Sequence, residues 1–257
     1  MPMYKPEYRA KSNKLPVLSK PELDEIGERF VAEFCPQALT SPCAIDIDMF
    51  AQDYLGLQQD FQFLSHNGIY LGKMVFHDTD SVVVYNPAEN VADYVSAAAR
   101  TIIIDNGLLD EKQEHRYRFT MGHEAAHDIL HAAYFDHAFN PDQLSLFGAT
   151  PVTPTVQCRI DSSKQPARTA NWTNNDWMEF QANRLSSAIL MPTAAVRLIV
   201  NEEKPHHDAF RAALCVQRVS KIFNVSLQAA EIRLRDLNTL NGISKQSIQE
   251  ELSLFTF

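Results

Sequence analysis

Regularly spaced apolar residues predict two long helices in the middle of this chain. Between residues 114 and 134, six small or apolar positions share one helical face at about 100° per residue: Phe119, Gly122, Ala126, Ile129, Leu130 and Ala133. Further on, Met178, Ala182, Leu185 and Ile189 form a second apolar stripe at helical spacing, followed by Pro192. The pattern therefore predicts one helix from about Glu114 to Tyr134 and another from about Trp177 to Leu190.

Shorter patterns predict the remaining elements. Helices are expected at residues 21–34, 45–54 and 92–99. Strands are expected at residues 61–64, 69–76, 81–85 and 101–105, with a hairpin turn at Asn67-Gly68. We expect the last of these strands to lie along the 114–134 helix and to offer its edge to an extended peptide.

The polar side of the 114–134 helix carries the most informative residues. His123, Glu124 and His127 form the pattern His-Glu-x-x-His. Residues four apart on an α-helix lie about 6 Å apart along its axis and on the same side, so both imidazoles can bind one cation. Glu124 would lie beside that cation, where it can take a proton from water. The pattern predicts a zinc site that faces a cleft.

A catalytic zinc site needs a third protein ligand and an open position for water. Glu179 is the candidate, because it lies off the apolar stripe of its helix; the alternative is a solvent-facing glutamate. Asn183 or Asp128 could orient a ligand imidazole through its second nitrogen, although Asp128 fits a capping or surface role equally well. His131 and Tyr134, on the metal side of the helix, are candidate donors to the oxyanion of peptide hydrolysis.

These motifs together resemble the ImmA/IrrE family of metallopeptidases. The resemblance rests on Arg118-Phe119-Thr120, on the helix from His123 to His131, on Glu179-Phe180-Gln181-Ala182-Asn183 and on Leu190-Met191-Pro192. Weaker similarity extends from about Pro42 to Leu237. Many relatives carry an acidic residue where this chain has Gln181.

The resemblance implies an α+β, zincin-like metallopeptidase, in which a small mixed β-sheet packs on the active-site helix and the C-terminal portion is helical. It implies an endopeptidase with His123, His127 and Glu179 as ligands of one Zn²⁺ ion and Glu124 as general base. Family members are known for cleaving helix-turn-helix repressors of mobile elements or stress genes. The expected partner is therefore such a repressor, as a protein substrate.

The expected organisation is a peptidase domain with an extension at each end. Residues 1–20 would form a flexible basic arm, residues 21–200 the zincin-like domain, and residues 201–257 a helical extension packed on that domain. Residues 151–176 would form a surface insertion loop, which either gates the substrate or is neutral. Cys158, within that loop, could bind the zinc as an inhibitory ligand.

The C-terminal pattern supports a competing function. Residues 216–223, a turn at Asn224 and residues 226–234 resemble a helix-turn-helix. Four basic residues could contact phosphates there: Arg218, Lys221, Arg233 and Arg235. Such a helix pair is also a common packing unit, and acidic neighbours dilute its positive charge. The alternative is a DNA-binding or protein-binding regulator in which the metallopeptidase fold is not catalytic.

Composition narrows the class of protein. A chain of 257 residues with 45% hydrophobic content supports a packed globular core. Its net charge of -9 disfavours broad nucleic-acid binding and leaves room for a basic protein substrate. Without a membrane-length apolar stretch or the apolar core of a signal peptide, a cytoplasmic location and no membrane partner are expected. Four scattered cysteines favour reduced thiols. The sequence predicts no particular oligomeric state.

Overall fold

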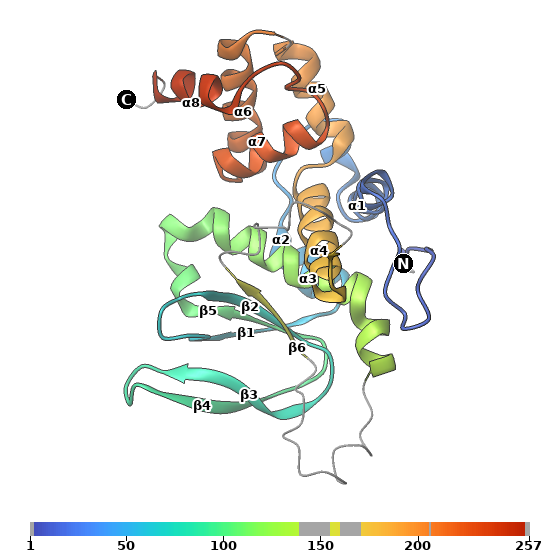
Figure 1. The fold of residues 1–257 in the computed structure, drawn as a ribbon, viewed down its shortest axis with the longest axis vertical. Coiled ribbons are helices and arrows are strands. Elements are labelled where there is room, and N and C mark those ends of the chain that lie inside the picture. Colours follow the sequence, from blue (N-terminus) through green and yellow to red (C-terminus); the bar gives the residue numbers. More distant parts are fainter. Residues whose placement is uncertain (1–2, 139–154, 160–170, 206, 255–257) are drawn as a thin grey trace. The chain divides into compact units, whose positions relative to one another are not determined.

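The computed structural model describes residues 3–138, 155–159, 171–205 and 207–254 (Figure 1). It is a mixed α+β structure with small sheets, which confirms that part of the predicted fold class. The chain divides into two compact units. Unit 1 comprises Met1–Tyr4, Asp24–Asp46 and Ser187–Phe257, and unit 2 comprises Lys5–Leu23 and Ile47–Ser186. The predicted organisation into residues 1–20, 21–200 and 201–257 stays a prediction.

A four-stranded sheet forms the centre of unit 2. Its strands are β1 (Gln58–Gln62), β2 (Tyr70–Val75), β5 (Thr101–Asp105) and β6 (Thr155–Arg159). They lie in the order β1-β5-β2-β6. The β1–β5 pair is parallel, whereas β2 is antiparallel to both β5 and β6. Every residue of β5 is buried, which explains its continuous apolar run.

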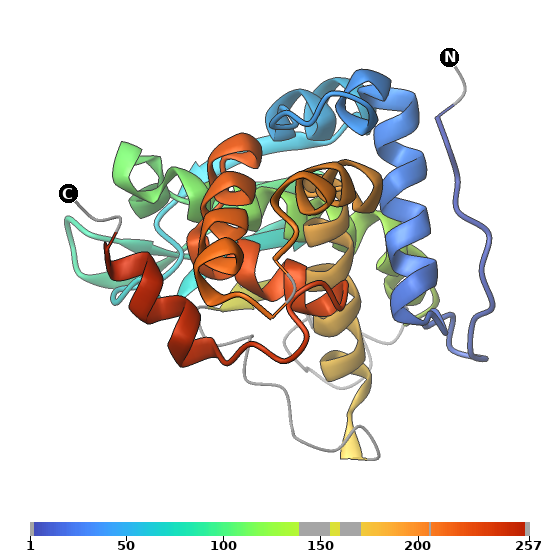
Figure 2. The ribbon, with the colours of Figure 1, turned by 90° about the horizontal axis from the view of Figure 1, so that it is seen from above.

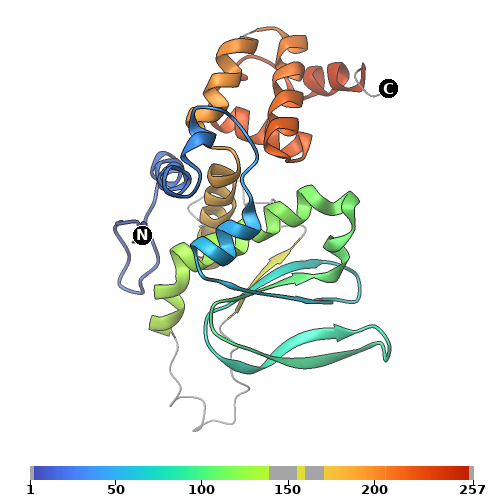
Figure 3. The same ribbon diagram turned by 180° about the vertical axis from the view of Figure 1, so that it is seen from behind.

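Helix α3 (Glu114–Ala138) covers one face of this sheet and a hairpin lies on the other (Figures 1 and 3). The hairpin consists of β3 (Thr79–Asn86) and β4 (Val91–Ala97). Hairpin and sheet share an apolar cluster of Leu64, Val75, Val82, Val84 and Ile103. The buried Lys73 of β2 also joins them, because its Nζ donates a 3.0 Å hydrogen bond to the carbonyl of Val83.

Several short helical segments complete unit 2, together with most of α4 (Asn174–Leu190). These segments are α2 (Ile47–Met49), a π-helical turn at Phe50–Tyr54, and 3₁₀ turns at Asn106–Leu109 and Glu111–Gln113. The last two turns connect β5 to α3 and begin at Asp105 and Asp110, whose side chains each accept a backbone N–H two residues on. The chain thus passes from the centre of the sheet into α3 through two capped turns.

Unit 1 is helical. It contains most of α1 (Lys20–Phe34), a 3₁₀ turn at Pro36–Leu39, α5 (Thr193–Glu203), α6 (Ala209–Phe223), α7 (Leu227–Asp236) and α8 (Lys245–Leu254). Helix α6 contacts α5, α7 and α8 (Figure 2). Between α6 and α7, Asn224 adopts a left-handed conformation and the hydroxyl of Ser226 accepts from the N–H of Ala229 at 3.1 Å. The predicted helix–turn–helix is thereby confirmed as local structure.

A buried arginine ties unit 1 together. Arg233 of α7 is fully inaccessible to solvent, and its guanidinium donates to Asp24 of α1 at 2.6 Å. The same guanidinium donates to the Met191 carbonyl at 3.0 Å and to the Thr193 hydroxyl at 3.1 Å. Arg233 therefore links α1, α7 and the junction between α4 and α5.

The N-terminal segment is more ordered than the sequence predicts. Leu15 and Leu18 are buried, and Ala10 pairs with Pro16 as an isolated antiparallel bridge. The Tyr8 hydroxyl also donates to the Leu130 carbonyl of α3 at 3.3 Å. The predicted flexible arm thus packs in part on unit 2, because its apolar residues find partners there.

Four local predictions need correction. Asn67-Gly68 does not close a hairpin, because β5 lies between β1 and β2. Residues 92–99 lie mostly in strand β4, since pairing with β3 decides their conformation. Strand β5 has a neighbour on each side and therefore offers no open edge to a peptide. The predicted loop at 151–176 contains β6 and the start of α4; its residues 151–154 and 160–170 lie outside the described part.

In the described part of the chain, no helix combines the length and the apolar character needed to cross a membrane.

Replacing Arg233 with methionine should lower the free energy of unfolding by about 3–5 kcal/mol, because it leaves the Asp24 carboxylate without its buried cation. Denaturant unfolding followed by circular dichroism measures this. The matched control is Arg218→Met in α6, whose guanidinium pairs with Glu202 and Glu203 but is 40% exposed. Arg218→Met should lower the free energy of unfolding by about 0–1 kcal/mol. Equal costs for the two variants would contradict a structural role for Arg233.

Candidate metal centre

Three predicted ligands converge in unit 2. His123 and His127 of α3 and Glu179 of α4 place one ligand atom each within 4.8 Å of one another. The Nε2 atoms of the two histidines are 3.0 Å apart. The Glu179 carboxylate lies 3.4 Å from Nε2 of His123 and 3.5 Å from Nε2 of His127. Both imidazoles are fully buried, whereas the Glu179 side chain is 13% exposed.

Small residues bring α3 and α4 close enough for this convergence. A Cβ atom on Gly122 would lie 2.7 Å from the hydroxyl oxygen of Ser186 in α4, so only glycine fits there. The Ser186 hydroxyl in turn donates to the Phe119 carbonyl at 3.2 Å. The apolar face predicted for α3 is therefore also its contact with α4, and this contact sets Glu179 opposite the histidine pair.

Glu124 lies between the helix and strand β2 and is fully buried. A Cβ atom on Gly72 of β2 would lie 2.8 Å from its Oε1 and 2.6 Å from Cγ2 of Thr120. Strand β2 can therefore approach the carboxylate only because residue 72 has no side chain. On the neighbouring residue Lys73, burial lowers the pKa and the charge of Glu124 opposes that effect.

The second nitrogens of the two histidines are held by different partners. Nδ1 of His123 lies 3.0 Å from Oδ1 of Asn183, as one of the predicted alternatives has it. Nδ1 of His127 lies 2.9 Å from Nδ1 of His131, and Nε2 of His131 lies 3.0 Å from Oε1 of Gln181. Gln181 then donates through Nε2 to the carbonyl of Pro16 at 2.9 Å.

Asp128 does not orient a ligand. Its carboxylate accepts from Nη2 and Nε of Arg100 at 2.8 and 3.1 Å, and the same guanidinium donates to the Leu55 carbonyl at 2.9 Å. Arg100 itself has a φ of 61°, in the left-handed region. Asp128 is buried and fastens α3 to the loops beside β1 and β5, which is none of the roles predicted for it.

The charges of the metal-free cluster suit a cation. Burial acts to raise the pKa of Glu179, but hydrogen bonds and charge from the two histidines outweigh it and hold that pKa far below its usual range. Burial lowers the pKa of His127 to about 4 and that of His131 well below its ordinary value. At His123, burial acts to lower the pKa, yet Glu179 outweighs it and raises the value. The cluster thus offers an ionised carboxylate, and His127 is neutral.

The two predicted oxyanion donors, His131 and Tyr134, differ in their surroundings. Both ring nitrogens of His131 have partners, so its N–H is not available to a substrate without breaking this network. Tyr134 is half-buried and lies seven residues beyond His127, about 10 Å along the helix. Its ring packs edge-on against Phe135.

Other predictions concern cysteines. Cys35, Cys43 and Cys215 are free, as expected for reduced thiols. The side chain of Cys158 lies outside the described part, although its backbone pairs with Gly72 across β2 and β6.

Sequence reasoning missed three contributors to the site. Gly72 and Pro16 act through backbone position, which leaves no side-chain signal in the sequence. Gln181 stood out only as a departure from the resembled family. Its role could have been sought from the spacing of His123, His127 and His131, which places a third imidazole on the same side of α3.

Residues 158–235 match the model of a peptidase family, M78, described as the IrrE N-terminal-like domain. The resemblance to the ImmA/IrrE family is confirmed. The ImmA/IrrE match includes Glu179, Gln181 and Asn183 of α4 and begins after the His123–His127 pair of α3. Among curated proteins, no match to this chain is found.

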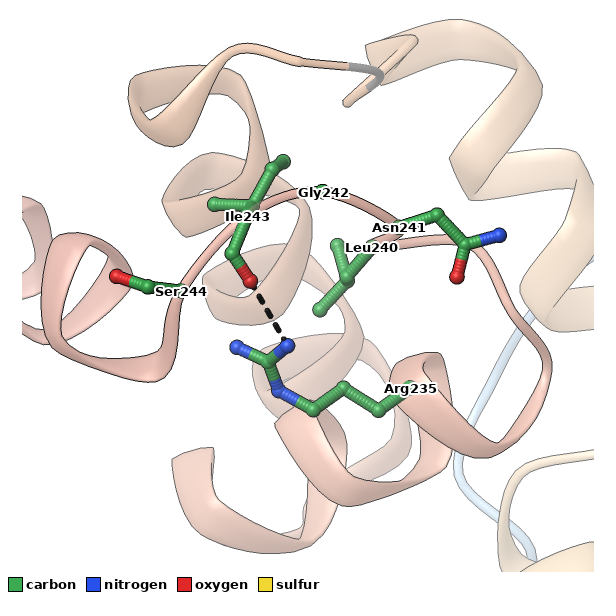
Figure 4. A pocket seen from close by; sticks show the side chains of 6 residues that line it. All are labelled: Arg235, Leu240, Asn241, Gly242, Ile243 and Ser244. Atoms are coloured by element: carbon green, nitrogen blue, oxygen red, sulfur yellow. Dashed lines mark hydrogen bonds between the residues drawn. The ribbon is translucent and has the colours of Figure 1, made fainter.

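A separate hollow lies in unit 1 (Figure 4). It is lined by Arg235, Leu240, Asn241, Gly242, Ile243 and Ser244. Arg235 donates to the Ile243 carbonyl at 2.9 Å and to Glu231 at 2.8 Å. The hollow contains none of the metal-centre residues, and the Arg235 guanidinium at its wall is already paired.

Replacing Gly72 with alanine should displace Glu124 and Thr120, because the added methyl group would overlap both. We expect a loss of about 1–3 kcal/mol in the free energy of unfolding, typical of overpacking in a core. Denaturant unfolding measures it. The control is Gly68→Ala, where no atom lies within 4 Å of the added Cβ and only a φ of +66° is strained. If Gly72→Ala were as stable as the wild type, the close approach of β2 to Glu124 would be wrong.

Proposed function

We propose that this protein is a zinc-dependent endopeptidase of zincin-like fold. The observation that carries the proposal is the meeting of His123, His127 and Glu179 beside the buried Glu124. The peptidase family match over residues 158–235 supports the same class of reaction. No other residues in the described part form a comparable cluster of three possible metal ligands.

The donor set fits zinc. Two neutral imidazoles and one carboxylate are the ligands of several catalytic zinc sites, which keep a further position for water or substrate. His123, His127 and Glu179 would hold the ion, and its positive charge would occupy a cluster that contains an ionised carboxylate. Such an ion acts as a Lewis acid and lowers the pKa of water. Asn183 and His131 would hold the two ligand rings in place.

Glu124 would move the proton. Its carboxylate would take a proton from the water that attacks the peptide carbonyl. It would then deliver that proton to the departing amine nitrogen as the carbon–nitrogen bond breaks, which leaves a new carboxyl terminus and a new amino terminus. The fixed position of Glu124 between α3 and Gly72 suits this task, because a buried base with one orientation needs little reorganisation.

The oxyanion needs a donor besides the metal. Of the two predicted residues, Tyr134 is the more suitable, because both His131 nitrogens already have partners. Tyr134 would act only on a substrate that extends along α3, given its distance from His127 along the helix.

We propose a helix-turn-helix repressor as the substrate. Such proteins carry basic surfaces, and a chain with a net charge of -9 would attract them. A cytoplasmic location is consistent with that substrate.

The competing function, DNA binding by α6 and α7, is disfavoured by the state of its arginines. Arg233 is buried, Arg218 pairs with Glu202 and Glu203, and Arg235 pairs with Glu231. Of the four predicted phosphate contacts, Lys221 is the exposed residue that forms no ion pair within the described part of the chain. A guanidinium that is already paired gives little affinity for phosphate.

Replacing Glu124 with glutamine should leave zinc bound but reduce turnover at least about 100-fold, because the variant cannot accept a proton. His127→Ala and Glu179→Ala should instead lose zinc. Elemental analysis of the purified proteins measures the metal, and cleavage of purified helix-turn-helix repressors, beginning with any encoded beside this gene, measures turnover.

Asp136→Asn near the end of α3 serves as the matched control, since its side chain is 65% exposed and its carboxylate lies 3.4 Å from Nε2 of His77. It should keep both metal and turnover. Wild-type cleavage rates in Glu124→Gln, or full zinc content in Glu179→Ala, would refute the assigned roles.

A gel-shift titration tests the competing function. We expect no complex with random duplex DNA at physiological salt, because the arginines of α6 and α7 are internally paired. A salt-dependent shift that weakens in Lys221→Glu would instead support a DNA-binding role.

A further inference from the structure

A chain of hydrogen bonds leads from the metal cluster to the main chain before α1. It runs from His127 to His131 at 2.9 Å, from His131 to Gln181 at 3.0 Å and from Gln181 to the carbonyl of Pro16 at 2.9 Å. The three side chains are no more than 1% exposed. Water therefore does not compete for these bonds, and the direction in which each one donates is decided inside the protein.

The carbonyl of Pro16 fixes that direction. A carbonyl oxygen only accepts, so the Gln181 amide must present its N–H to Pro16 and its Oε1 to His131. Oε1 can only accept, and His131 must therefore carry its proton on Nε2. Because a neutral imidazole carries one N–H, Nδ1 of His131 then holds a lone pair. The proton between the two rings therefore belongs to Nδ1 of His127.

This order leaves Nε2 of His127 with a lone pair. Nε2 is the atom that lies 3.0 Å from Nε2 of His123 and 3.5 Å from Glu179. A neutral imidazole binds a metal only through its unprotonated nitrogen. The opposite tautomer of His127 would place a hydrogen where the ion belongs.

We infer that Pro16, Gln181 and His131 form a relay that holds His127 in its metal-binding tautomer before any metal arrives. His131 and Gln181 are then positioning residues: they act on the metal through His127 and not on the substrate. The inference rests on the proposed metal site but not on catalysis. His123 differs: its Nδ1 lies 3.0 Å from Oδ1 of Asn183, and among the described residues no main-chain carbonyl accepts a hydrogen bond from that amide.

The tautomers can be observed directly in the metal-free protein. Long-range ¹H–¹⁵N correlation spectra of protein labelled on histidine distinguish a protonated Nδ1 from a protonated Nε2. We expect Nδ1–H for His127 and Nε2–H for His131, with signals assigned by substituting each histidine in turn. In Gln181→Met, which removes the acceptor, both histidines should show mixed tautomers. A protonated Nε2 on His127 in the wild type would overturn the relay.

Zinc affinity gives a second measurement. Competition with a chromogenic chelator should show binding weakened by about tenfold or more in Gln181→Met, as for other partners of ligand histidines. Gln181→Glu should restore most of that loss, because either oxygen of the new side chain can accept from His131. Its thermal stability should still fall if the ionised side chain repels the Pro16 carbonyl. Gln62→Met, which removes an amide that donates to Asp60 at 3.1 Å, should bind zinc as the wild type does.

The outcomes separate a positioning role from a merely structural one. A structural role predicts that zinc affinity follows thermal stability in both Gln181 variants, and this result would refute the relay. Unchanged tautomers and zinc affinity in Gln181→Met would refute it as well. If the wild type shows the expected tautomers but binds no zinc, the proposed function fails while the relay stands. If Gln181→Met does not fold, the tautomer spectra of the wild type and the zinc affinity of Gln181→Glu still test the relay.

Discussion

Polar atoms removed from water need partners of matching polarity, and this requirement governs the centre of unit 2. Three imidazoles on α3 are fully buried, yet each finds its partners on α3 or α4. The packing of the two helices therefore has to bring these partners together as well as the apolar stripes. Gly122 permits that packing and the Ser186 hydroxyl helps to hold it. The same contact between α3 and α4 thus determines both how the helices pack and how the polar groups of the cluster are arranged.

Helices and ligands were predictable because their signals are local. The period of the apolar residues gives α3 and α4, and the His-Glu-x-x-His spacing gives two possible metal ligands on one helical face. Glu179 followed from the need for a third ligand on a neighbouring helix. Its geometry agrees with that prediction, because the packing that the apolar stripes specify also brings the carboxylate to the histidines.

Strand order and partner choice were not predictable in the same way. Asn67-Gly68 has the composition of a hairpin turn, but β5 inserts between its flanking strands, and β5 pairs with residues 26 to 43 positions away along the chain. Residues 91–97 have no strong local preference, and pairing with β3 makes them a strand. Pro16 is the clearest case, since a backbone carbonyl is present at every residue and carries no mark in the sequence.

The packed segment before α1 brings the main chain of residue 16 next to Gln181. This N-terminal segment therefore contributes to the interior of unit 2, although its sequence suggests a dispensable arm. Proteolytic cleavage between that segment and α1, or a shortened gene that starts later, would remove no side chain with obvious chemistry. It would nevertheless withdraw the last acceptor in the interior network. A shortened form would keep every sequence motif of the candidate metal centre. Its affinity for a metal ion would nevertheless differ from that of the full chain.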